Sequence, residues 1–230
     1  MGQIIRAFWG DDQLPRAYSK ILREVERSAK QMANLDQVVF VFGDENAEAV
    51  RKFGFEQVVQ LSEDGMVFPP GGRCDGSMWR HKTAAIREGL ARFGEVIHVD
   101  WDVSIPNKLP GDLWDRLREK GTLQMPLQQY FRRQCYWRKD DCEPRKLPYG
   151  CFIYISDVAH LDAMQAIWDE HGKPAWTDEH PAAFYTDQLT GGWQGVEEYE
   201  RRFEPYCCVV RRSPLSKESI AAKVPLFICP

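Results

Sequence analysis

The chain has 230 residues, enough to bury one substantial core, and this length predicts a single domain. Hydrophobic residues at 43% and charged residues at 28% are ordinary globular values, which exclude a disordered, collagen-like or coiled-coil chain. The formal net charge of -4 argues against a protein whose overall field binds nucleic acid or anionic membrane. The seven cysteines show no Cys-x-x-Cys spacing, and no apolar run approaches the roughly 20 residues of a membrane span. We therefore expect free thiols, a cytoplasmic location and no integral membrane association.

The first hundred residues alternate between predicted strands and predicted helices. Runs of β-branched and aromatic residues predict three strands, at residues 3–9, 38–42 and 55–61. Apolar residues at three- and four-residue spacing predict three helices, at residues 15–32, 46–53 and 77–93. Short connections in this order require parallel strands joined by right-handed crossovers. The sequence therefore predicts an α/β fold, with a mixed, mostly parallel sheet flanked by helices.

The second half of the chain contains further predicted strands and helices. A long loop is predicted earlier, before the helix at residues 77–93. Strands are predicted at residues 122–127, 150–155 and 207–210. Helices are predicted at residues 112–120, from Ser156 or Asp157 to about residue 168, and around residues 184–189. The segment 62–76 is rich in proline and glycine, and its length suits either a plain connector or a flap near a site.

Two aspartates follow a short apolar strand at residues 96–99. Side chains alternate across a strand, so Asp100 and Asp102 leave on one side and Trp101 on the other. An isolated Asp-x-Asp more often marks a solvated turn, but the apolar run places both acids at a strand's carboxyl end, where open α/β sheets bind ligands. Two convergent carboxylates suit Mg²⁺ or Mn²⁺. We therefore expect Asp100 and Asp102 to hold a divalent cation beside the aromatic ring of Trp101.

Two cations lie early in the helix that leads into this strand. Arg80 and Lys82 on a helix are usually solvated surface charges. Because the helix runs directly into the strand with the two acids, either side chain could instead bind a phosphate. Both interpretations stay open at this point.

The order of these motifs resembles the GT-A-fold glycosyltransferases that use nucleotide-diphosphate sugars, loosely those of family eight. The resemblance spans roughly residues 3–189 and rests on the order of the first strands and helices, the early helix residue Lys82, and three later motifs: EVIHVDWDV, LPYGCFIYIS and FYTDQL. It implies one GT-A-like domain over residues 1–230, with a nucleotide-binding half at 1–103 and an acceptor-binding half at 104–230. It also implies transfer of a sugar from a nucleotide-diphosphate donor, most simply a UDP-sugar, to an acceptor hydroxyl.

The resemblance also implies roles for particular residues. Asp100 and Asp102 would hold Mn²⁺ or Mg²⁺ on the diphosphate. The nucleotide-binding candidates lie at the end of the first strand, on the helix at 77–93 and in two turns: Phe8, Trp9, Gly10, Arg80, Lys82, Trp101 and Gly150. Core packing of Trp9 is an equal alternative. The catalytic candidates are Asp187, Gln188, Glu179 and Asp178. Of these, Asp187, or else Glu179 or Asp178, would deprotonate the acceptor or stabilise a cationic sugar.

A basic and aromatic segment, residues 128–146, is the candidate for binding the acceptor. Its flat and charged side chains are Tyr130, Tyr136, Trp137, Arg132, Arg133, Arg138 and Lys139. Such a composition suits a glycan that carries phosphate or carboxylate groups. It also suits a modified base in DNA, because bases stack on aromatic rings and phosphates pair with Arg. A solvated loop with its aromatics packed beneath it is the alternative.

The sequence departs from the family pattern at two points. No histidine follows His180, although several retaining families place a metal ligand there, and Tyr149-Gly150-Cys151 lacks the Asn of an Asn-x-Gly turn. Inversion or retention of the sugar configuration stays open. Two other functions also stay open: a nucleotide-sugar-binding module without turnover, and a haloacid-dehalogenase-like phosphotransferase with the first Asp as nucleophile. The latter class normally places its motif on the first strand, whereas three predicted strands precede it here.

Overall fold

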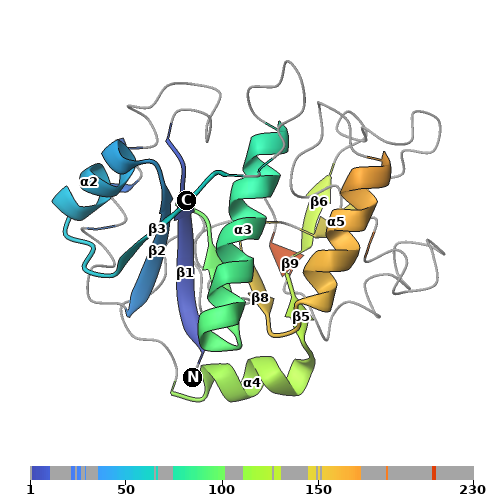
Figure 1. Cartoon of the computed structure of the whole chain (residues 1–230). Helices are drawn as coiled ribbons and strands as arrows, with labels where there is room; N and C mark the ends of the chain where they lie inside the picture. The colour runs from blue at the N-terminus through green and yellow to red at the C-terminus, as the bar shows by residue number, and fades with distance from the viewer. Residues whose placement is uncertain are drawn as a thin grey trace.

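The computed structural model describes residues 2–10, 22–23, 25–26, 29, 36–64, 66, 75–101, 111–125, 127–130, 145–148, 150, 152–171, 185 and 209–210. Over these residues the chain forms one mixed α/β domain in which helices flank a six-stranded sheet (Figure 1). A three-stranded sheet accompanies the large one. None of the described helices is long and apolar enough to cross a membrane.

The elements agree with most of the predicted ones. The large sheet contains β1 (Gln3–Phe8), β2 (Gln37–Phe42), β3 (Val58–Leu61), β4 (Val96–Val99), β5 (Leu123–Gln124) and β8 (Phe152–Ile155). The small sheet contains β6 (Leu127–Tyr130), β7 (Arg145–Pro148) and β9 (Val209–Val210). The helices with described bounds are α2 (Asp44–Lys52), α3 (Asp75–Phe93), α4 (Leu113–Lys120) and α5 (Ala159–His171). Most of the predicted helix at 15–32 lies outside the described residues, and so does the one at 184–189 except for Tyr185.

The large sheet has the strand order β3-β2-β1-β4-β8-β5. The pairs β3–β2, β2–β1 and β1–β4 are parallel, whereas β8 is antiparallel to both β4 and β5. Within this sheet β8 is therefore the reversed strand, and the prediction of a mixed, mostly parallel sheet is confirmed. Four strands come from residues before 104 and two from residues after it, so both predicted halves of the chain build one sheet.

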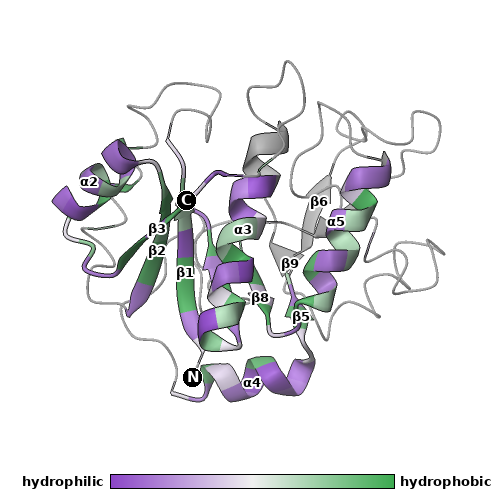
Figure 2. Cartoon of the chain, in the orientation of Figure 1, coloured by the Kyte–Doolittle hydropathy of each residue, from purple (hydrophilic) through white to green (hydrophobic). Residues whose placement is uncertain are grey.

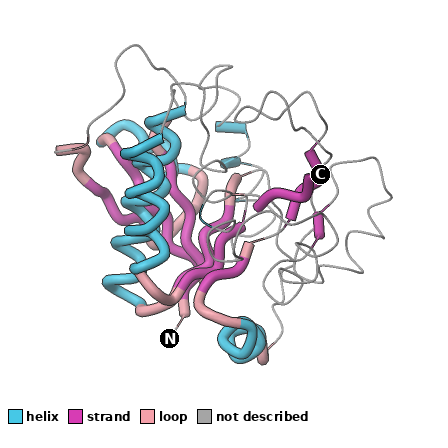
Figure 3. The backbone as a smooth tube through the Cα atoms, turned by 90° about the vertical axis from the view of Figure 1, so that its right-hand side faces the viewer, coloured by secondary structure: helices cyan, strands magenta, loops and turns pink. Residues whose placement is uncertain are grey.

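Two apolar clusters cover the faces of the large sheet, because side chains alternate along each strand. On one face α3 and α5 pack against Ile5 and Phe40, and against inward residues of β8. On the other face α2 packs against Val39 and Val41, together with Trp101. Figure 2 shows hydrophobic colour over most of β2, hydrophobic and hydrophilic bands in turn along β1, and mostly hydrophilic colour on α2 and α4. Figure 3 shows long helices standing to one side of the strands.

Two local predictions are wrong, and one strand was not predicted. Helix α3 begins at Asp75, two residues before the expected cap Ser77, so its first turn includes Gly76. The N–H groups of a first helical turn have no intrahelical partner whatever the residue, so a glycine costs little there. The predicted strand at 122–127 divides into β5 and the start of β6, which belong to different sheets. Strand β7 was not predicted at all; it pairs with β6, which places Tyr130 opposite Arg145.

Candidate functional site

The carboxyl ends of β1, β2, β3 and β4 lie at one edge of the sheet, because these strands are parallel. Strand β8 runs the other way and therefore begins at this edge, with Phe152 opposite Val99. The predicted site residues that follow β1, follow β4 and precede β8 lie at this edge: Trp9, Gly10, Asp100 and Gly150. Open α/β sheets bind their ligands at such an edge.

Lys82 of α3 joins two of these segments. Its Nζ lies 2.9 Å from Oδ1 of Asp100 and donates a hydrogen bond to the carbonyl oxygen of Gly150 at 3.2 Å. The Lys82 side chain is 4% exposed, whereas the Asp100 side chain is 31% exposed. A buried ammonium needs such oxygen partners, since its desolvation is otherwise costly. The residues predicted to bind phosphate and metal thus contact each other directly.

His98 lies two residues before Asp100, on the same face of β4. It is buried, its Nδ1 lies 3.9 Å from Oδ1 of Asp100, and within the described part of the chain Nδ1 has no hydrogen-bond partner. Burial lowers the pKa of His98 well below its usual value, and the charges of Lys82 and Arg6 lower it further. The imidazole is therefore neutral at neutral pH. Sequence reasoning missed this residue.

A fully buried arginine of β1, Arg6, also reaches the end of β4. Its Nε donates a hydrogen bond to Oε1 of Gln37 at 3.0 Å, and its Nη1 donates one to the backbone oxygen of Asp100 at 2.8 Å. Its guanidinium carbon lies 5.0 Å from the centre of the Trp101 ring. Sequence reasoning missed Arg6, although an arginine inside an apolar strand signals a buried polar partner.

Trp101 leaves β4 on the side opposite the Asp100 carboxylate, as predicted. It is 4% exposed and packs edge-to-face against Phe8 and Phe55, with ring centroids 6.1 and 5.6 Å away. Its Nε1 donates a hydrogen bond to the backbone oxygen of Ala7 at 2.8 Å. The surroundings of Trp101 are therefore those of a core side chain, and its contact with a ligand stays a prediction.

Arg80 is directed toward α5 in this structure. Its Nη2 lies 3.6 Å from Oδ1 of Asp169, and 24% of its side chain is exposed. Of the two cations predicted to bind a phosphate, Lys82 lies at Asp100, and the half-buried Arg80 lies near Asp169 of α5. A phosphate contact of Arg80 stays a prediction.

Trp9 stacks on His81 of α3. The ring centroids are 5.2 Å apart and the planes differ by 6°, while Phe42 approaches the same imidazole edge-on at 4.5 Å. Nε2 of His81 lies 2.6 Å from Oε1 of Glu63, which follows β3. Trp9 is 7% exposed, so it packs in the core here, and a role in base stacking stays a prediction. His81 and Glu63 were missed because neither belongs to a sequence motif.

Gly10 ends β1 in a conformation that favours glycine. Its φ is +89°, and a Cβ at this position would lie 2.8 Å from Nδ2 of Asn46. The same Nδ2 donates a hydrogen bond to the backbone oxygen of Phe42 at 2.7 Å, so Asn46 is held in place. Phe8, the other candidate at the end of β1, is fully buried. The ends of β1 and β2 are thus packed closely together.

Five predicted site residues lie outside the described residues: Asp102, Asp178, Glu179, Asp187 and Gln188. Within the described ranges no three His, Cys, Asp or Glu side chains come together as metal ligands. Asp100 offers the carboxylate oxygen that a hard cation prefers, and the ammonium 2.9 Å away shows that positive charge is stabilised beside it. Asp100 therefore fits one ligand position of a Mg²⁺ or Mn²⁺ ion.

Comparison of the sequence with protein-family models and with curated proteins finds no match. Among solved structures, mouse xyloside xylosyltransferase 1 in its apo form is similar with 11% identity and a TM-score of 0.45, over 91% of this chain and 85% of that one. A nucleoside-diphosphate-sugar pyrophosphorylase from Vibrio cholerae RC9 is similar with 12% identity and a TM-score of 0.41, over 82% of this chain and 88% of that one. Likenesses this distant carry no argument about the chemistry of the site.

Proposed function

We propose that the chain is a metal-dependent glycosyltransferase that moves a sugar from a nucleotide-diphosphate donor, with a UDP-sugar as the first candidate. The observation that carries the proposal is the Lys82–Asp100 pair, with its 2.9 Å contact at the edge where the parallel strands end. The resemblance of EVIHVDWDV and the motifs after it to the GT-A family supports the same function. In this proposal Asp100 and Asp102 hold Mn²⁺ or Mg²⁺.

Lys82 supplies positive charge to the departing diphosphate in the proposed reaction. A bound divalent cation would supply positive charge to the departing diphosphate. Lys82 adds a second positive charge, because its Nζ can exchange the Asp100 carboxylate for a phosphate oxygen when a donor arrives. The backbone oxygen of Gly150, 3.2 Å from Nζ, keeps the ammonium at the site during that exchange. The charge that develops as the sugar–phosphate bond breaks is then met by groups already in place.

The ends of β1 and β2 supply the proposed wall for the nucleotide. Trp9, His81 and Phe42 pack together there, and the hydrogen bond from His81 to Glu63 holds the imidazole in one orientation. A flat base is suited to aromatic neighbours of this kind. Gly10 lets the chain turn closely after Trp9, so the donor can approach the backbone.

The acceptor side of the proposal rests on sequence. Asp187, or else Asp178 or Glu179, would deprotonate the acceptor hydroxyl or stabilise a cationic sugar, with Gln188 beside Asp187 in the sequence. Strands β6 and β7 pair with each other, so the basic and aromatic segment between them starts and ends at the small sheet. We assign this segment to a glycan acceptor, with a modified DNA base as the less favoured substrate.

A thermal-shift screen of nucleotide sugars, each with and without Mn²⁺, tests the proposed function. A ligand that binds only the folded chain raises its melting temperature by mass action. We expect a nucleotide-diphosphate sugar to do so only when Mn²⁺ is present, and the bound donor to be hydrolysed slowly. A screen without any Mn²⁺-dependent shift would overturn the proposed function, and binding without hydrolysis would turn it into that of a non-catalytic module.

A further inference from the structure

Arg6 carries a charge inside the apolar core, where an apolar side chain would fill the same space. It is 0% exposed in the middle of β1, between apolar neighbours in the strand. A buried guanidinium costs more free energy than an apolar side chain of similar volume, unless its N–H groups are well bonded. Two of its hydrogen bonds go to different neighbours, Gln37 of β2 and the backbone of Asp100 after β4. The guanidinium therefore links the two strands that flank β1.

The Arg6 bond lies where the backbone pairing of β1 and β4 has ended. The registered pairs run from Gln3 opposite Val96 to Ile5 opposite His98. Beyond that point, the side chain of Arg6 donates to the backbone oxygen of Asp100 at 2.8 Å. A side-chain hydrogen bond thus replaces the strand pairing at the residue that carries the candidate metal ligand.

A second hydrogen bond joins the chain after β4 to β1. Nε1 of Trp101 donates to the backbone oxygen of Ala7 at 2.8 Å, and the Trp101 ring lies 5.0 Å from the guanidinium carbon of Arg6. The peptide that joins Asp100 to Trp101 is therefore held to β1 through its own carbonyl oxygen and through the side chain of the residue that follows it. Both Arg6 and Trp101 are buried, so water does not compete with either bond.

We propose that Arg6 is a positioning residue of the site. Together with Trp101 it clamps the peptide between Asp100 and Trp101 to β1, and the clamp sets the direction in which the Asp100 carboxylate leaves the strand. The inference rests on the proposed function in one respect only, which is that Asp100 is a metal ligand. Outer residues that orient a ligand commonly change metal affinity by about 10- to 100-fold.

The test compares Arg6→Met with Glu95→Gln, a change at the opposite end of β4. Mn²⁺ alone is titrated into each protein, and its affinity and paramagnetic resonance spectrum are recorded. Deuterium uptake of residues 99–101 is measured without metal. We expect Arg6→Met to bind Mn²⁺ about tenfold more weakly, with an altered spectrum and faster uptake. Glu95→Gln should keep the wild-type affinity and spectrum, and Arg6→Lys, which keeps the charge and one donor, should recover part of the affinity.

The outcomes separate this inference from the proposed function. Wild-type Mn²⁺ affinity, spectrum and deuterium uptake in a folded Arg6→Met protein would overturn the clamp. If Arg6→Met does not fold, Trp101→Phe decides instead, because it removes the bond to Ala7 and keeps an aromatic ring beside Phe8 and Phe55. An unchanged uptake at residues 99–101 overturns the clamp, and a faster one supports it. A wild-type protein that binds no Mn²⁺ would overturn the metal role of Asp100, and the deuterium uptake would then decide the clamp by itself.

Discussion

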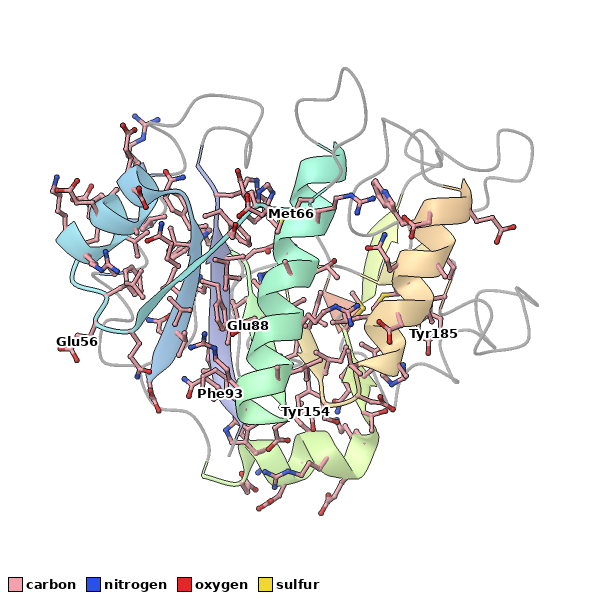
Figure 4. All side chains as sticks on the ribbon, in the orientation of Figure 1. Glu56, Met66, Glu88, Phe93, Tyr154 and Tyr185 are labelled. Atoms are coloured by element: carbon pink, nitrogen blue, oxygen red, sulfur yellow. The ribbon has the colours of Figure 1, made fainter. Side chains whose placement is uncertain are left out.

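Strand β4 has a carboxylate at each end, and the two differ in their exposure and in the partners named for them among the described residues. Glu95, before the strand, accepts hydrogen bonds from Nε of Arg118 at 3.1 and 3.2 Å, from its Nη2 at 2.6 Å, and from the Tyr154 hydroxyl at 3.1 Å. Asp100, after the strand, has the Lys82 ammonium at 2.9 Å and keeps 31% of its side chain exposed, against 11% for Glu95. Figure 4 shows Tyr154 at the end of the sheet near α4, far from Met66 at the other end.

The difference shows which carboxylate is available to a ligand. Burial is the largest single influence on Glu95 and opposes its ionisation, but the hydrogen bonds from Arg118 and Tyr154 outweigh it and its pKa is lowered. Glu95 thus serves as a tie between α4 and the large sheet. The Asp100 side chain is 31% exposed, and in the proposed function its partner Lys82 moves to a phosphate oxygen. A carboxylate at a strand end is therefore a site candidate when its partner can be exchanged.

The largest expected effect concerns Asp100, the carboxylate after β4. Asp100→Asn should weaken Mn²⁺-dependent UDP binding by about a hundredfold, because an amide is a poor ligand for a hard cation and a poor partner for Lys82. Calorimetry with the preformed Mn²⁺–UDP complex measures the loss, and circular dichroism verifies the fold. Glu95→Gln is the control and should bind normally. Normal binding by Asp100→Asn would show that the two carboxylates do not differ in this way.

The next largest effect concerns the exchange of partner by Lys82. Lys82→Met removes a cation that competes with a metal at Asp100, so its affinity for Mn²⁺ alone should rise by about threefold to tenfold. The same variant loses a phosphate partner, so its affinity for the Mn²⁺–UDP complex should fall by about tenfold. Arg87→Met is the matched control, since Arg87 lies on the same helix and pairs with Asp162 at 2.7 Å on the surface. Two changes of the same sign would contradict the exchange.

A feature of this protein could be predicted from the sequence when residues that are neighbours in the chain determine it. The strands at the start of the chain were predictable, because runs such as Val38 to Phe42 are long and apolar, and Asp100 was placed correctly at a strand end. The reversal of β8 was not predictable, since a strand's direction depends on the path of the chain before it. The contact between Lys82 and Asp100 depends on how α3 crosses β4, which no motif states. Arg6 had a local signal, a charge in an apolar strand, but its partner is 94 residues away.

A smaller effect concerns Glu95, the carboxylate before β4. Glu95→Gln should lower the melting temperature at pH 7 by about 5 °C, because it removes the charge that Arg118 and Tyr154 stabilise. The pKa of Glu95 is lowered in the folded state, so its contribution is fully present above the ordinary value of 4.5 and is lost as the pH falls through the folded-state pKa. Urea unfolding from pH 7 to pH 3 should therefore show wild type and variant converging in acid. A difference that is constant with pH would argue against an ionic tie.

The smallest effect isolates one bond of that tie. Tyr154→Phe removes the hydroxyl that donates to Oε2 of Glu95 and leaves the bonds from Arg118 in place. We expect a loss of about 1 kcal/mol in the free energy of unfolding, or about 3 °C in melting temperature. Burial raises the pKa of Tyr154, so the hydroxyl stays protonated and the effect should not vary between pH 6 and about pH 9. A variant as stable as wild type would leave Arg118 as the sole support of Glu95.

The strand order affects how the chain folds during its synthesis. Strand β1 lies inside the sheet between β2 and β4, yet β4 is synthesised only after α2, β3 and α3. At about 5–20 residues per second on the ribosome, one side of β1 stays without its partner for several seconds. An open apolar strand edge is a template for pairing with another chain. The nascent protein is thus exposed to edge-to-edge aggregation during that interval, and the emergence of the strand that leads to Asp100 ends it.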